Sequence, residues 1–192
     1  MLTGITNENE FYAAHYLDAI LTKDIKAAGW VVEKDEIPPD RALGRLRGEY
    51  FRLKNRLERS HDRQDRLSQQ REFFQQVLTI LGYDWQPQLK LLDNDRFLPI
   101  LAEVSHSPGQ PKLWILEAFN PSDEPNDSLS LSLDPLQYQG LGDGEERANE
   151  LAELTLEDCL TSQVFAQNAP PRWVIMISID HLVLIDRHKW NA

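Results

Sequence analysis

The sequence lacks the features that mark several large classes of protein. Its 192 residues include one cysteine, Cys159, which excludes an internal disulfide and a CxxC zinc or redox pair. No uninterrupted apolar run comes near the roughly 20 residues that span a bilayer, and no basic-then-apolar segment opens the chain as in a secretion signal. We therefore expect a cytoplasmic protein, because an unpaired cysteine suits a reducing compartment.

Several catalytic motifs are absent as well. The sequence has no P-loop, no G-x-G-x-x-G and no G-x-S-x-G, which removes the usual signals of nucleotide binding and of α/β-hydrolase chemistry. Four of the histidines, His61, His106, His181 and His188, have no metal-type spacing with one another. Function must therefore be sought in charge and in isolated polar residues.

Charge is unevenly distributed along the chain. The net charge of −11 argues against a general polyanion binder. Residues 41–71, however, hold ten basic and four acidic side chains, and so carry +6 while the rest carries −17. Residues 122–158 hold eleven acidic side chains against Arg147 alone. The two segments are expected either to attract each other or to face different partners.

The first 82 residues are predicted to be helical. Asn7 and Glu10 form a capping-box pattern that predicts a helix ending near Gly29. Asp40 is a suitable N-cap for a second helix, and a third is predicted to end at Gly82.

The second helix is predicted to have two faces. Apolar residues at steps of three and four predict one seam: Leu43, Leu46, Tyr50, Leu53 and Leu57. Arginines with the same spacing are predicted on the opposite face: Arg52, Arg56, Arg59, Arg63 and Arg66. An unbroken helix over 41–66 would make this arginine stripe about 38 Å long, at roughly 1.5 Å per residue.

The remainder of the chain, residues 83–192, is typical of an α/β core. Short apolar runs at 88–92, 97–105 and 112–119 are separated by turn signals and predict strands. Residues 120–144 are predicted to be a long loop with a short edge strand possible at 129–133, and 145–166 a helix with a break and a new cap near Thr155. Strands at 173–179 and 181–185 complete an α-β-β-β-α-β order. That order is the core order of the PD-(D/E)xK nucleases, although other α/β sandwiches share it.

Glu103 and Glu117 stand out because each is an acid in an otherwise apolar strand. Pairing the two strands about Gly109 places residue 103 opposite 115 and residue 101 opposite 117, so that both glutamates face the same way as diagonal neighbours at roughly 7–8 Å. Two such carboxylates can hold Mg²⁺ and support phosphodiester hydrolysis. The alternative is that each is a buried acid paired with an arginine or with backbone amides, or a strand-end acid in water.

Three further observations bear on function. The PD-(D/E)xK signature has a lysine two residues after its second acid, where this chain has Phe119, which argues against cleavage. The arginine stripe predicts either contact with a phosphate backbone or a solvated face balanced by local acids or by the acidic segment 122–158. The cluster from Asp186 to Trp190 follows the last strand, where sites often gather, but it also suits a capped strand end.

Several short segments, scattered along the sequence, resemble a known protein family. They are Thr6–Tyr12, His15–Leu17, Leu81–Tyr83, Leu98–Ile100, Leu113–Ala118, Pro171–Val174 and Leu184–Trp190. These segments resemble the N-terminal region of bacterial type IIG-like restriction–modification proteins, which fuse a nuclease-like domain to an adenine-specific DNA methyltransferase.

The resemblance implies a role in cutting, recognising or modifying DNA in phage defence. It implies a PD-(D/E)xK-like core with a helical N-terminal arm, DNA and the methyltransferase region as partners, and Mg²⁺ held by Glu103 and Glu117 as catalytic residues. S-adenosylmethionine would bind only a C-terminal part absent from this sequence, which we expect to be an N-terminal domain of a longer protein. Without the lysine, a degenerate module that positions DNA or docks the methyltransferase is the alternative.

Overall fold

The structure, a computed structural model, describes residues 4–8, 10–27, 37–122, 126–142, 144–148 and 150–190. Within them the fold is α/β, with a two-stranded sheet and a four-stranded mixed sheet. No helix in this part of the chain has both the length and the apolar character needed to cross a membrane.

The strands form an antiparallel hairpin beside a larger sheet. The hairpin joins β1 (Gln88–Leu91) to β2 (Phe97–Ile100). The larger sheet has the order β3 (Ala102–Ser107), β4 (Gln110–Glu117), β5 (Trp173–Ile177) and β6 (Leu182–Asp186). Strands β4 and β5 are parallel, and both edge strands run antiparallel to their neighbours. The predicted strand over 97–105 is thus divided at Leu101 between the two sheets.

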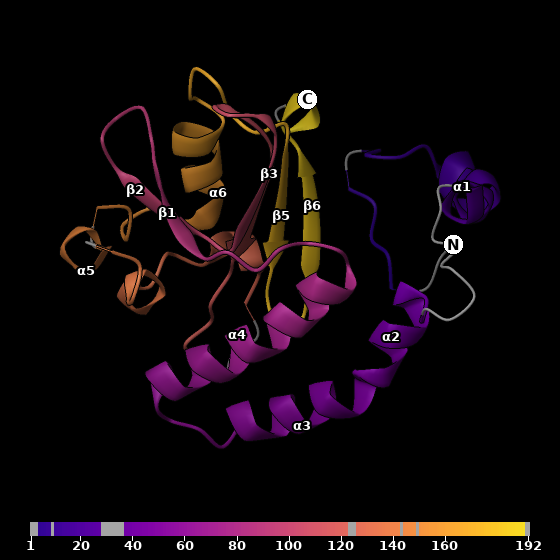
Figure 1. The fold of residues 1–192 in the computed structure, drawn as a ribbon, viewed down its shortest axis with the longest axis horizontal. Helices are drawn as coiled ribbons and strands as arrows, with labels where there is room; N and C mark the ends of the chain where they lie inside the picture. The colour runs from indigo at the N-terminus through magenta and orange to yellow at the C-terminus, as the bar shows by residue number, and fades with distance from the viewer. Residues whose placement is uncertain are drawn as a thin grey trace.

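Helices lie on both faces of the larger sheet (Figure 1). On one side α4 (Arg63–Ile80) buries Phe74 and Leu78 against Ile115 and Ile175. On the other side α6 (Leu156–Cys159), which continues as a π-helical turn over Leu160–Val164, packs with Trp114 in a second core. The central strands are apolar on both faces because both faces are covered.

The remaining helices are short. They are α1 (Leu21–Ala27) after a π-helical turn (Tyr16–Ile20), α2 (Pro39–Arg45), α3 (Arg47–Leu57), α5 (Gly144–Arg147), and single 3₁₀ turns at Ser128–Ser130, Pro135–Tyr138 and Arg187–Lys189. Thr155 caps α6 by accepting from the backbone N–H of Asp158, which confirms the predicted cap. The predicted edge strand at 129–133 is reduced to one bridge between Ser132 and Thr155.

The unbroken helix predicted over 41–66 is wrong. The chain turns between α3 and α4, and Figure 1 shows the two helices side by side. Asp62 has extended backbone angles, and its carboxylate accepts from the N–H of Asp65 at 2.9 Å, which starts a new helix. The turn lets α3 pack Leu53 and Leu57 inward. The rest of the predicted apolar seam is only partly buried, and the seam is divided between two helices because the chain is also interrupted at Leu46, between α2 and α3.

The predicted N-terminal caps also differ from those observed. The Asn7 side chain bonds to both the N–H and the C=O of Tyr12, and Glu10 has a φ of 49°, so neither residue caps a helix. The predicted end near Gly29 lies outside the described residues. Helix α2 begins at Pro39, which places Asp40 inside its first turn instead of at the cap.

Gly82 ends α4 as predicted. Its φ is +83°, and the N–H of Tyr83 reaches the C=O of Leu78 at 2.9 Å, which closes a Schellman motif. Gly82→Ala should therefore destabilise the protein by about 1 kcal/mol, since a Cβ disfavours the left-handed conformation. Urea unfolding followed by circular dichroism measures this change.

Gly48 in α3 provides the matched control. An added Cβ there meets no atom within 4 Å, and Gly48 has no positive φ. Gly48→Ala should stabilise the protein by about 0.5–1 kcal/mol, because alanine favours a helix interior. Equal effects of the two substitutions would contradict the described conformation of Gly82.

Candidate functional site

Glu117 lies at the end of β4, enclosed between the sheet and α4. Its side chain is buried, with 3% of the residue exposed. One carboxylate oxygen accepts from Gln70 Nε2 at 3.0 Å, and the other accepts from Arg71 Nε at 2.9 Å and lies 2.9 Å from a terminal guanidinium nitrogen. Gln137 donates to the backbone carbonyl of Glu117 at 2.9 Å. The carboxylate is therefore satisfied by protein groups alone.

Two opposing effects act on the ionisation of Glu117. Burial raises the pKa of the carboxyl, because a charge is poorly solvated in the interior. Arg71 and the hydrogen bond from Gln70 lower the pKa, but burial is the larger effect and the pKa stays above its usual value. The charged form of Glu117 therefore depends on Arg71.

Glu103 lies on β3 in a different environment. It pairs across the ladder with Trp114, forms an ion pair with Lys90 of β1, and accepts a hydrogen bond from Ser105 at 2.5 Å. Partial burial acts to raise the pKa of its carboxyl, but Lys90 and Ser105 outweigh that effect and lower it. Glu103 is thus an ionised acid that links β3 to the two-stranded sheet.

The predicted pairing of the two glutamates is wrong. The β3–β4 ladder places Ala102 opposite Ile115 and Glu103 opposite Trp114, one residue away from the predicted register. A shift of one residue moves a side chain to the other face of a sheet. Glu103 accordingly shares a face with Trp114, whereas Glu117 faces α4. The two carboxylates are not diagonal neighbours, and one ion cannot bind between them as the sequence predicted.

The reason for the different register lies in the hairpin and its irregular ladder. The pairing shifts between Val104 and Ser105 and again before Ser107, so the turn at Gly109 does not set the register farther along the strands. Instead, Ala102 of β3 is buried with Ile115 in the core beneath α4, which places Glu103 on the other face of the sheet. Among the described residues, no group of three or more His, Cys, Asp and Glu side chains is placed to hold a metal ion.

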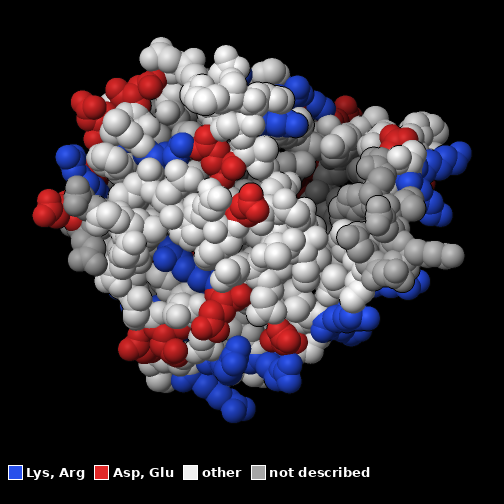
Figure 2. Space-filling model, viewed as in Figure 1, with Lys and Arg blue, Asp and Glu red and all other residues white. Residues whose placement is uncertain are grey.

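The five arginines of the predicted stripe divide into two groups. Arg52, Arg56 and Arg59 are exposed on α3 and the turn after it, and the described residues include no hydrogen-bond or ion-pair partner for their side chains. Figure 2 shows Lys and Arg side chains gathered along the lower edge of the molecule, where Figure 1 places α3. This group forms an open cationic face, which we call the α3 arginine face.

The other two arginines turn toward the protein. Arg63 forms an ion pair with the buried Asp134, and Arg66 is 8% exposed. Arg66 donates to the backbone carbonyls of Leu57 at 2.5 Å and Ser122 at 3.0 Å. Both arginines therefore hold α4 against the segment 122–158. The alternative interpretation expected this role for all five arginines of the stripe, and the structure shows it for these two.

A cavity of about 240 Å³, lined by both polar and apolar side chains, lies where β4 and β5 end, and the sequence did not predict it. Its walls include Asn120, Ser178 and His181 from the loops after these strands and Lys54 from α3. Because β4 and β5 are parallel, their carboxyl ends meet at one edge of the sheet, where ligands often bind. The sequence does show polar residues directly after two apolar strands, which could have indicated a site. It does not show that these two strands are parallel neighbours.

The cluster after the last strand lies elsewhere. Strand β6 runs antiparallel to β5, so Asp186 is at the opposite end of the sheet from the cavity. Asp186 is buried, accepts from the N–H of His188 at 3.1 Å and lies 3.5 Å from Arg172. These contacts match a capped strand end.

The Arg71–Glu117 pair generates a testable expectation. Arg71→Leu should destabilise the protein by about 3–5 kcal/mol at pH 8, since it leaves a buried charge unpaired. Without Arg71 the pKa of Glu117 rises further, so stability is retained at low pH and lost as the pH increases through that pKa. Urea unfolding at pH 5 and pH 8 should therefore show a smaller loss at pH 5.

Lys54→Met is the control for this measurement. Lys54 contacts Asp180 at 2.7 Å, but the side chains are 38% and 46% exposed. Exposed pairs contribute about 0–1 kcal/mol, so this loss should be small at both pH values. A loss for Arg71→Leu no greater than that for Lys54→Met would show that Glu117 does not depend on its partner.

Comparisons of this chain with protein-family models, with curated proteins and with solved structures gave no match.

Proposed function

We propose that this domain is the nuclease-like module of a restriction–modification protein and that it positions DNA without cutting it. The observation that carries the proposal is the α3 arginine face, on which Arg52, Arg56 and Arg59 are exposed together. Guanidinium groups bind phosphate oxygens well because their donors match the geometry of the anion. An attached methyltransferase would then supply the chemistry.

The dimensions of the face suit a short phosphate contact. Residues 52–59 span roughly 10 Å at about 1.5 Å per residue. Successive phosphates of one strand advance by about 3.4 Å along the duplex axis, so three arginines can contact up to about three phosphates. The strongly acidic remainder of the chain would limit contact to this face, since it repels the DNA elsewhere.

The finer fold assignment belongs to the same proposal. A PD-(D/E)xK-like core is supported by the succession of α4, the strands through β4, α6 and then β5. A mixed sheet covered by α4 and α6 on opposite faces is also in keeping with it. The helical arm of this proposal, residues 1–82, ends with α4, the helix that covers the sheet.

Three observations favour positioning over cleavage. Arg71 and Gln70 occupy the carboxylate of Glu117, where a metal ion would have to bind. Glu103 lies on the other face of the sheet and is paired with Lys90. Phe119, at the position of the catalytic lysine, is buried with 2% exposed and offers no cation to a phosphate.

DNA binding should depend on the α3 arginine face. Replacing Arg52, Arg56 and Arg59 together with glutamine should weaken binding to a duplex at least about tenfold at low salt. It should also reduce the slope of log K against log[salt] by roughly 2–3, because each lost phosphate contact removes about 0.9. Fluorescence anisotropy over a series of salt concentrations measures both quantities.

A matched control removes the same charge elsewhere. Lys23, Lys26 and Lys112 are exposed on α1 and β4, away from α3, and their replacement with glutamine should leave the salt slope nearly unchanged. If both triple variants lose affinity equally, the effect is one of overall charge and the proposal fails.

Metal ions distinguish a metal site formed by Glu103 and Glu117 from two separately ion-paired acids. We expect Mg²⁺ or Mn²⁺ at millimolar concentration to leave the melting temperature unchanged, since Glu117 is already paired with Arg71. A clear rise that is lost in Glu117→Gln, together with cleavage of plasmid DNA, would instead favour a Mg²⁺-dependent endonuclease in which Glu103 and Glu117 take part.

A further inference from the structure

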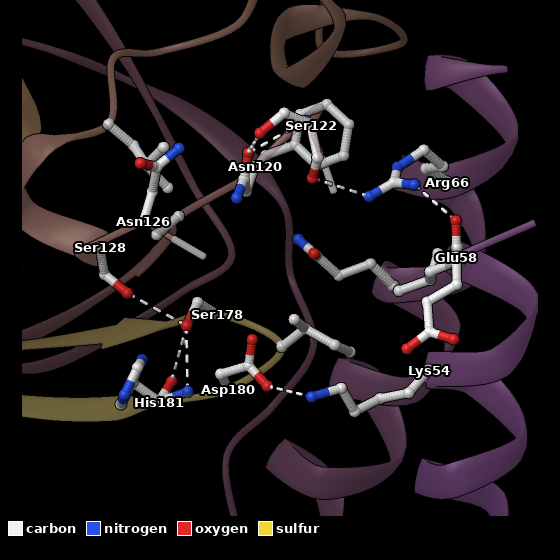
Figure 3. A pocket seen from close by; sticks show the side chains of 16 residues that line it. Lys54, Glu58, Arg66, Asn120, Ser122, Asn126, Ser128, Ser178, Asp180 and His181 are labelled. Carbon is white, nitrogen blue, oxygen red and sulfur yellow. Dashed lines mark hydrogen bonds and ion pairs between the residues drawn. The ribbon is translucent and has the colours of Figure 1, made fainter. Parts of the chain in front are cut away.

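The cavity at the carboxyl ends of β4 and β5 has two distinct walls. Figure 3 shows Asn120, Asn126 and Ser128 with Ser178 and His181 on one side, all from segments that follow the strands. Lys54, Glu58 and Arg66 face them from α3 and α4. Apolar side chains, among them the partly exposed Leu131 and Ile179, also line it. The cavity thus lies between the sheet and the helical pair.

The charged side chains that the structure describes in the lining balance one another. Lys54 contacts Asp180 at 2.7 Å, and Arg66 donates to the carbonyls of Leu57 and Ser122. Glu58 and Asp180 offset these two cations in the lining. The described lining residues therefore offer an anion no surplus positive charge, and they include no group of metal ligands. A neutral ligand fits this balance best.

The polar groups in the cavity are mostly amides, hydroxyls and an imidazole. The side chains of Asn126 and His181 have no hydrogen-bond partner among the described residues, and both line the cavity. Ser128 and Ser178 hydroxyls lie 3.1 Å apart and hold the two loops together. A carboxamide presents a donor and an acceptor side by side, which matches the edge of a nucleobase.

We propose that this cavity binds a nucleobase, presented as a nucleoside, through Asn126 and His181. Its volume of about 240 Å³ is below that of pockets for drug-sized ligands, about 300–1,000 Å³, and suits a small ring system. The partly exposed apolar side chains of Leu131 and Ile179 contact the ring, while the amide and imidazole bind its polar edge.

This site is separate from the α3 arginine face. Lys54 is two residues from both Arg52 and Arg56, a rotation of about 200° on an α-helix. The cavity and the arginines therefore lie on different sides of α3. A nucleoside carries no phosphate, so its binding does not require the arginines and tests the cavity independently of the DNA-positioning proposal.

Titration of the ¹⁵N-labelled protein with the four 2′-deoxynucleosides, followed by NMR, tests the proposal. At least one should produce saturable shifts at Asn126 and at backbone amides around Ser178, with a Kd at or below about 1 mM. Asn126→Ala and His181→Ala should each weaken binding about fivefold to tenfold, the effect of one lost hydrogen bond. Both residues are exposed, so the variants should fold.

The control is His106→Ala, which removes an exposed histidine from the β3–β4 hairpin. It should leave the affinity unchanged. Ribose and inorganic phosphate serve as comparison probes, and neither should produce the same shifts. The proposal is overturned if no nucleoside gives saturable shifts, if ribose or phosphate reproduces them, or if His106→Ala weakens binding as much as the cavity variants.

Discussion

The parallel pairing of β4 with β5 is the constraint on which the rest of this structure depends. These strands are buried on both faces, with Val174, Ile115 and Met176 almost fully enclosed. A parallel pair requires a crossover connection and a cover on each face. The connection carries α6 to one face, and α4 covers the other. The same pairing brings two polar loops together at one edge, where the cavity lies.

Electrostatic contacts then determine how the helical pair is held. Arg71 reaches Glu117 at the end of β4, Arg63 reaches Asp134, and Lys54 reaches Asp180 in the loop after β5. Part of the positive charge of the basic segment thus forms ion pairs with acidic residues elsewhere in the chain. The arginines of the α3 arginine face have no such partners among the described residues. The proposed DNA contact therefore uses arginines that form no ion pair with the rest of the described fold.

The sequence allowed a good part of the fold to be predicted. The α/β class, the hairpins at Asp93–Asp95 and Gly109, the helix end at Gly82 and the cap at Thr155 all follow from local chemistry, and the structure has each of them. The predicted long helix failed because Asp62 offered a competing local cap. Local preferences decide such features, and the competing cap was itself visible in the sequence.

The candidate sites were decided by tertiary structure. Glu103 and Glu117 were identified as acids in apolar strands, but whether they share a face depended on the strand register. In that register Ala102, and not Glu103, is buried with Ile115 beneath α4. Predicting the cavity required knowing that β4 and β5 are parallel neighbours. The alternation of residues along a strand does not reveal which strands pair or in which direction. The sequence by itself determined which residues are charged, apolar or able to cap. Only the packed sheet decided which of them meet, because the faces and ends of strands acquire neighbours through contacts distant in the chain.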